Sequence, residues 1–88
     1  MDKTSAEKAM YELTLLLMYL SRFGEKSPFG EDIRAWKGYD FDIMNQLCDE
    51  DYIWQGKNPS KVKSVSLTEE GVDYAKKLMR KYNISDWD

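Results

Sequence analysis

Residues 52–67, YIWQGKNPSKVKSVSL, decide the fold that this sequence predicts. Aromatic and β-branched residues at both ends predict two short strands, and QGKNPSK between them is rich in turn-forming residues. Pro59 fits the turn, because the interior of a sheet has no place for a residue without an amide N–H. A two-stranded hairpin is marginal by itself in water. We therefore expect it to pack against helices from the rest of the 88-residue chain.

A helix is predicted on each side of this hairpin. The first starts at a capping box formed by Thr4 and Glu7, and Gly24 is placed to end it. The last is capped by Thr68 and has one clean apolar face. The apolar residues at helical spacing are Ala6, Met10, Leu13, Leu17 and Leu20 in the first helix, and Val72, Ala75, Leu78, Met79 and Tyr82 in the last.

The first helix is apolar almost all the way round. Its apolar surface is widened by Leu15, Leu16, Met18 and Tyr19. A helix of this kind is either central in the core or shared with a second chain. Both alternatives are open from the sequence, and we expect a homodimer through the first or the last helix.

The segment between the first helix and residue 40 is predicted to hold a linker and a short helix. Residues 26–30, KSPFG, form the linker, because Pro28 rules out a continuous helix. Residues 31–36 are predicted to be helical, with acids in the first turn where the helix dipole favours them, and Gly38 stops this helix.

A further short helix is predicted over residues 41–50. Asp40 is a good N-cap for it, and Asp51 lies at its end, where a left-handed residue is often needed. Two short helices separated by a glycine-containing turn have the order of a helix-turn-helix. The residues expected to point inward from this helix are Ile43, Met44 and Leu47.

The elements together predict a winged helix-turn-helix: a mostly α, α+β fold in which a small β-hairpin follows the helices. Eighty-eight residues provide one core, so residues 1–88 form a single domain. Residues 1–4 and 83–88 are expected to be tails.

Two segments carry a resemblance to known families. LCDEDYI at 47–53, followed by VKSVSLTEEGVDYAKKL at 62–78, resembles winged-helix proteins of the PadR and MarR type, although Asp51 stands where those proteins usually carry Gly. RAWKGYDFDIMNQL at 34–47 and KVKSVSLTEEG at 61–71 are similar to a family of small bacterial proteins of unknown function, which share an Arg-Ala-Trp-Lys-Gly segment and a Leu-Thr-Glu-Glu-Gly box. This resemblance implies a winged-helix fold and no particular activity.

Charge is distributed unevenly along the chain, whose net charge is −3. Residues 31–54 carry seven acids against Arg34 and Lys37, whereas residues 55–67 carry three lysines and no acid. The middle of the chain is therefore acidic and the hairpin is basic. An acidic chain is repelled by phosphate, so DNA binding would depend on the hairpin.

The helix over residues 41–50 occupies the position of a recognition helix, and two functions are open for it. Asn45 and Gln46 could contact bases, since an amide side chain can bind adenine through two hydrogen bonds. However, no Lys or Arg lies between Lys37 and Lys57 to contact phosphates. The alternative is a protein-interaction surface, and the acids on it would be Asp42, Asp49 and Glu50.

The hairpin lysines and one tryptophan are the remaining binding candidates. Lys57, Lys61 and Lys63 could follow a DNA backbone as a wing does, or could simply promote solubility. Trp87 lies in an acidic tail and is either docked on the protein or available to a protein partner. Trp36 and Trp54 are expected in the core.

No residue pattern indicates an enzyme, a cofactor or a metal site. The chain has no histidine and a single cysteine, Cys48, which we expect to be a small buried residue. One cysteine also excludes an internal disulfide. The longest apolar run, residues 13–20, is far shorter than the roughly 20 residues that span a bilayer. We therefore expect a cytoplasmic protein without a membrane partner.

Overall fold

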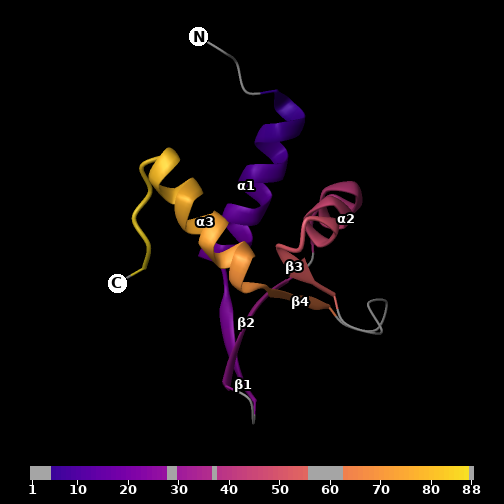
Figure 1. Cartoon of the computed structure of the whole chain (residues 1–88), viewed down its shortest axis with the longest axis vertical. Helices are drawn as coiled ribbons and strands as arrows, with labels where there is room; N and C mark the ends of the chain where they lie inside the picture. Colours follow the sequence, from indigo (N-terminus) through magenta and orange to yellow (C-terminus); the bar gives the residue numbers. More distant parts are fainter. Residues whose placement is uncertain (1–4, 28–29, 37, 56–62, 88) are drawn as a thin grey trace.

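The computed structural model describes residues 5–27, 30–36, 38–55 and 63–87. It is an α+β structure in which the three helices gather at one end of the molecule. A hairpin formed by the strands at residues 23–27 and 30–36, distinct from the predicted hairpin, projects from the other end (Figure 1). The elements in chain order are α1 (Ala6–Leu20), β1 (Phe23–Ser27), β2 (Gly30–Trp36), α2 (Phe41–Asp49), β3 (Ile53–Trp54), β4 (Ser64–Leu67) and α3 (Glu69–Lys81).

The four strands form one antiparallel sheet in the order β1-β2-β4-β3. The pairing of β2 with β4 joins the two hairpins, with Arg34 opposite Ser66 and Ala35 opposite Val65. Directly opposite residues of an antiparallel pair point to the same face. Ala35 and Val65 are both fully buried, so their face of the sheet packs on the core that the helices supply. The largest fully buried side chains of this core are Leu15, Met18, Leu47, Ile53, Leu78 and Val65.

The predicted hairpin is confirmed. Ile53 pairs with Leu67 and Trp54 with Ser66, and the predicted turn between them lies mostly outside the described residues. Asp51 precedes the hairpin with φ of 65°, as expected for a left-handed residue at a helix end. The finer prediction, a winged helix-turn-helix, is not confirmed by this arrangement.

The caps of the later helices are also confirmed. The Asp40 carboxylate accepts from the amide of Ile43 at 3.1 Å, and the Thr68 hydroxyl accepts from the amide of Gly71 at 3.0 Å. The first helix differs from the prediction: Ser5 is its N-cap and accepts from the amide of Lys8 at 3.1 Å. Thr4, the predicted cap, lies outside the described residues.

The prediction for residues 23–36 is wrong. Residues 31–36 belong to strand β2, and residues 26 and 27 of the predicted linker belong to strand β1. Gly24 lies within β1, because α1 already ends at Leu20. A helix of six residues satisfies few of its own backbone groups, whereas β2 pairs with β1 over residues 30–34 and with β4 over residues 34–36. The first helix of the predicted helix-turn-helix is therefore absent.

The expectation that Trp36 and Trp54 lie in the core is also wrong, since their exposed fractions are 60% and 58%. Trp36 is opposite Ser64, and Trp54 is opposite Ser66, so both rings lie on the sheet face turned away from Ala35 and Val65. Arg34 lies on the same outer face and donates to the hydroxyls of Ser64 and Ser66, each at 3.0 Å. Because successive residues of a strand point to opposite faces, burying Ala35, Ile53 and Val65 places the neighbouring tryptophans outside.

Candidate binding site between helices α1, α2 and α3

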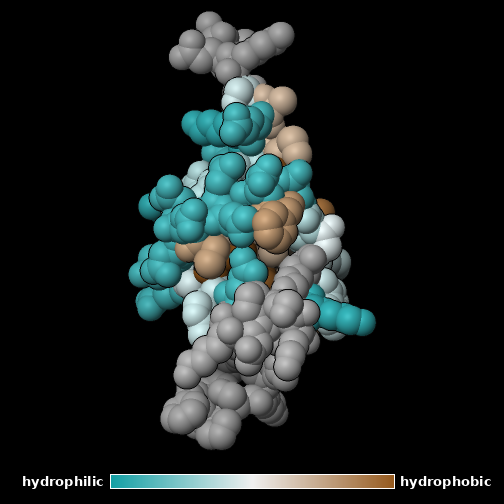
Figure 2. Space-filling view, turned by 90° about the vertical axis from the view of Figure 1, so that its right-hand side faces the viewer, coloured by the Kyte–Doolittle hydropathy of each residue, from teal (hydrophilic) through white to brown (hydrophobic). Residues whose placement is uncertain are grey.

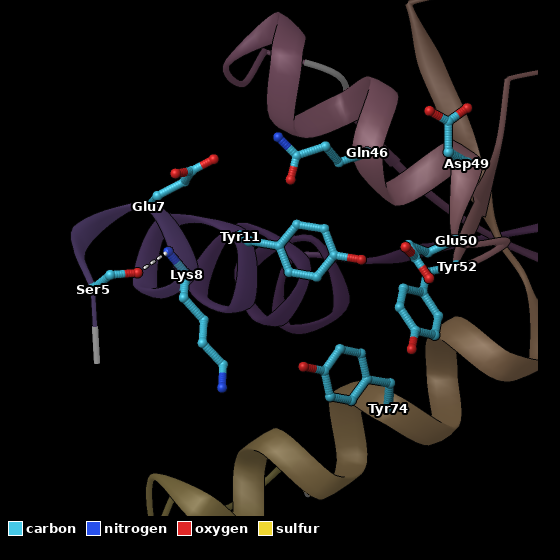
Figure 3. Close-up of a pocket in the computed structure, with 9 residues that line it drawn as sticks. All are labelled: Ser5, Glu7, Lys8, Tyr11, Gln46, Asp49, Glu50, Tyr52 and Tyr74. Carbon is cyan, nitrogen blue, oxygen red and sulfur yellow. Dashed lines mark hydrogen bonds between the residues drawn. The ribbon is translucent and has the colours of Figure 1, made fainter. Parts of the chain in front are cut away.

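An open pocket of about 500 Å³ lies between the three helices, beside the end of α2 (Figure 3). Its walls combine aromatic rings with acidic side chains. Helix α1 and its N-cap contribute Ser5, Glu7, Lys8 and Tyr11, the end of α2 contributes Gln46, Asp49 and Glu50, and the remaining two residues are Tyr52 and Tyr74.

Three tyrosines form the floor of the pocket. The rings of Tyr52 and Tyr74 lie 4.8 Å apart between centroids, tilted by 38°. The ring of Tyr11 reaches across from α1 toward them (Figure 3). Burial, followed by the charge of Glu50, raises the pKa of Tyr11 to about 12. Burial, followed by the charge of Glu12, raises the pKa of Tyr74 to about 12 as well. These two rings are therefore uncharged phenols at neutral pH.

Tyr52 is held in place by its backbone. Its amide donates to the carbonyl oxygen of Leu47 at 2.9 Å, which closes the end of α2. Its own carbonyl oxygen accepts from the amide of Thr68 at 3.0 Å, which fixes it to the start of α3. One residue therefore links two of the helices that form the pocket.

A buried carboxylate lies behind the tyrosines. Glu12 of α1 is only 3% exposed and accepts from the hydroxyls of Tyr74 and Tyr82 at 3.2 and 2.7 Å and from Lys81 Nζ at 2.7 Å. Burial by itself raises the pKa of Glu12, but the hydrogen bonds from Lys81, Tyr82 and Tyr74 outweigh it and the net pKa is lowered. The charged group thus ties α1 to α3 and orients Tyr74.

The predicted recognition-helix residues are exposed on α2, and the structure brings only some of them to the pocket. Gln46, Asp49 and Glu50 line it, whereas Asp42 and Asn45 lie elsewhere on the exposed surface of the helix. Hydrophilic residues predominate among the coloured residues on this side of the molecule (Figure 2). Asp42, Asp49 and Glu50 are all exposed, and the last two adjoin an aromatic pocket.

Of the other predicted contacts, Lys63 and Trp87 do not line the pocket. Lys63 is exposed just before β4, and Lys57 and Lys61 lie outside the described residues. The Trp87 indole N–H donates to the carbonyl oxygen of Leu20 at 2.6 Å, although 74% of the residue is exposed. Trp87 is thus attached at the end of α1, with most of its ring facing solvent.

Tyr11, Tyr74 and Glu12 were not predicted as site residues from the sequence, and Tyr52 was predicted only as part of a strand. Glu12 did carry a usable signal: it is an acid on the helix face formed by Leu15, Leu16 and Tyr19, where a charge needs partners. The tyrosines carried no such signal, because they come from three separate segments.

The described part of the chain contains no group of three or more His, Cys, Asp or Glu side chains placed to hold a metal ion. Among the same residues, no helix combines the length and the apolarity needed to cross a membrane.

A model of one protein family, described as a domain of unknown function (DUF6429), matches residues 6–85. No curated protein and no solved structure matches the chain.

Proposed function

Because the chain belongs to the DUF6429 family, whose description assigns no activity, we propose its function from the site itself: a protein-interaction module that binds a positively charged segment of another protein on the acidic surface of α2. We define this surface as Asp42, Gln46, Asp49 and Glu50.

The observation that supports the proposal is the exposed acidic surface beside a tyrosine-lined pocket. Neither Asp49 nor Glu50 forms an ion pair with any residue that the structure describes. Exposed acids that are not neutralised locally attract cations and accelerate their association. Tyrosine is enriched in the centres of protein interfaces, because it buries a large ring and keeps a polar end.

The same surface argues against DNA as the partner of α2. Phosphate contacts supply most of the affinity of nonspecific DNA binding, and the chain has no Lys or Arg between Lys37 and Lys57. A duplex placed on α2 would bring phosphates toward Asp42, Asp49 and Glu50 instead.

The proposal is tested by fluorescence anisotropy with a labelled peptide in which arginines alternate with serines. We expect wild type to bind it more weakly as salt increases. The double variant Asp42→Asn/Asp49→Asn should bind about tenfold more weakly, as expected for two charge contacts. A matched control, Glu69→Gln/Asp73→Asn, removes the same charge from exposed positions of α3 and should stay within about twofold. Absence of binding at low salt, or equal losses from both variants, would overturn the proposal.

A second candidate function is DNA binding through the hairpin, as the winged-helix prediction suggests. Lys63 is exposed beside β4, and Lys57 and Lys61 add charge to the same loop in the sequence. Titration with random duplex DNA at low salt tests it. Binding that weakens, with a flatter salt slope, when all three lysines become Glu would support this candidate and disfavour the acidic surface.

We also propose that two copies associate through α1. Met10, Leu13 and Leu17 are 49%, 47% and 51% exposed and follow the alternating spacing of three and four residues found in coiled coils. This stripe carries no charge, so it can meet its own copy without the repulsion that the net charge of −3 imposes elsewhere.

A further inference from the structure

We infer that the pocket between α1, α2 and α3 is a receptor for a guanidinium group, the head of an arginine side chain, held between tyrosine rings and the carboxylate of Glu50. The inference rests on the proposed function, in that the arginine belongs to the basic partner segment.

The rings provide the first half of this recognition. Tyr11, Tyr52 and Tyr74 come from α1, from the segment after α2 and from α3, and their rings converge on one space (Figure 3). The face of an aromatic ring is negative, so it attracts a cation placed over it. Tyr11 and Tyr74 keep their protons far above neutral pH, because burial raises the pKa of each to about 12. The cation therefore meets neutral rings.

A carboxylate provides the second half. Glu50, at the end of α2, lies beside the Tyr52 ring and the hydroxyl end of Tyr11, whereas the Asp49 carboxylate points away from the rings (Figure 3). The single basic residue among the lining residues, Lys8, projects from α1 toward α3, on the side of the pocket away from Glu50 (Figure 3). The side of the pocket nearest α2 thus combines negative charge with aromatic surface and has no cation of its own among the lining residues.

A guanidinium fits this combination better than an ammonium. It is planar, so it can stack on a ring, and its N–H groups point outward in the plane toward carboxylates. An ammonium is compact and strongly hydrated, and it gains less from a ring. Anions are excluded by the same carboxylate. We therefore expect arginine to be preferred over lysine.

The pocket is tested first with small molecules, by following the backbone amides of the protein in NMR titrations. The probe is N-acetyl-arginine amide, and the matched control ligand is N-acetyl-citrulline amide, which has nearly the same shape and no charge. We expect shift changes concentrated at residues 7–11 and 46–52 and at Tyr74, with millimolar affinity for the arginine compound and none for the citrulline compound.

Two variants and one control locate the interaction. Tyr11→Leu removes a ring and Glu50→Gln removes a charge, and each should weaken binding of the arginine compound about fivefold. Glu50 is exposed at the C-cap of α2, so its variant keeps the inference testable if Tyr11→Leu does not fold. Glu69→Gln, an exposed acid outside the pocket, should leave the affinity unchanged. Equal binding of the two ligands, or shifts elsewhere on the protein, would overturn the inference.

The guanidinium could belong to a partner protein or to a free small molecule. Measuring the affinity of peptides in which one arginine is replaced by citrulline distinguishes the two sources. Loss of affinity at a single position would support an arginine carried by a partner protein. If citrulline at any position leaves the affinity of the peptide unchanged, while the variant Asp42→Asn/Asp49→Asn still lowers that affinity, this inference fails and the proposed function stands. If the arginine compound binds in the pocket and basic peptides bind no more tightly than it does, the proposed function fails and the pocket is a site for a free small cation.

Discussion

The backbone carbonyl of Tyr52 fills the space where a side chain on Gly71 would begin. A Cβ atom at Gly71 would clash with the carbonyl oxygen of Tyr52 and lie 2.9 Å from its carbonyl carbon. The first turn of α3 is therefore packed directly on the backbone that carries a pocket tyrosine. Only glycine allows this approach, since every other residue has a Cβ.

Gly71→Ala should consequently destabilise the fold by about 3 kcal/mol or more, at the upper end of the cost of overpacking, because the obstacle is backbone and not a flexible side chain. Urea unfolding followed by circular dichroism measures the change. Ala substitution at the exposed position of Asp73 on the same helix should change stability by less than about 0.5 kcal/mol. A Gly71→Ala protein as stable as wild type would show that α3 does not pack on Tyr52 in solution.

Glu12→Gln should destabilise the protein by about 2 kcal/mol, since it weakens three hydrogen bonds to a buried carboxylate and turns an amide donor toward groups that are themselves donors. Chemical denaturation provides the measurement. The matched control is Glu7→Gln, an exposed acid of the same helix, which should have little effect. Equal stability of the two variants would contradict a structural role for the Glu12 cluster.

Acid should unfold the protein partly through this cluster. The net pKa of Glu12 in the folded chain is lowered from its ordinary value of 4.5, so folding favours the charged form. Its contribution is fully present above that ordinary value and is lost as the pH falls through the lower native value. The free energy of unfolding is measured from about pH 6 downward, a start well above the ordinary pKa of Glu12. It should fall less steeply with pH in Glu12→Gln than in wild type. Parallel curves for the two proteins would refute this.

Asp86→Ala should release the C-terminal tail. The Asp86 carboxylate accepts from both terminal nitrogens of Arg22, at 3.1 and 3.2 Å, and from the Tyr19 hydroxyl at 3.0 Å. The pair is partly exposed, so the loss of stability should be only about 1 kcal/mol. The sharper measurement is hydrogen exchange at the Trp87 indole N–H, which should accelerate as its bond to Leu20 opens. Unchanged exchange would mean that Trp87 is attached independently of Asp86.

Charged residues on the α1 stripe should prevent self-association. We expect wild type to sediment as a mixture of monomer and dimer whose proportions depend on concentration, and Leu13→Glu/Leu17→Glu as a monomer at every concentration. Both positions are about half exposed, so the fold should survive the change. Ser85→Glu adds an acid at another exposed position and serves as the control for charge. A wild-type mass that is monomeric at all concentrations would end the proposal.

Local chemistry explains which parts of this fold the sequence could predict. The caps at Asp40 and Thr68 and the left-handed Asp51 each depend on residues within a few positions of one another, and the two strands of the second hairpin follow each other directly in chain order. The strands β1 and β2 do not. Their polar residues, among them Glu25 and Asp32, conceal the alternation of a strand, and pairing with β4, some 30 residues away, stabilises β2.

Of the candidate site, only the acidic residues could be predicted from the sequence. Asp49 and Glu50 are adjacent in the sequence and belong to one helix end, so their exposure followed from the helical pattern. The tyrosines of the site could not be predicted, because they come together only when α1 packs on α3. That packing brings Tyr11 near Tyr74, which lies 63 positions later in the sequence. No periodicity within a single segment contains that information.

The outward placement of the tryptophans affects how this protein should be followed in solution. All three indoles, Trp36, Trp54 and Trp87, are more than half exposed in the folded chain. Their fluorescence in the folded chain should therefore already be that of a solvent-exposed indole, and unfolding should move the emission maximum only slightly. The same rings are open to collisional quenchers such as acrylamide or iodide in the native state. A ligand or a second copy that covers the outer face of the sheet would therefore be detected as protection of Trp36 and Trp54 from quenching, and binding in the tyrosine pocket would leave that signal unchanged.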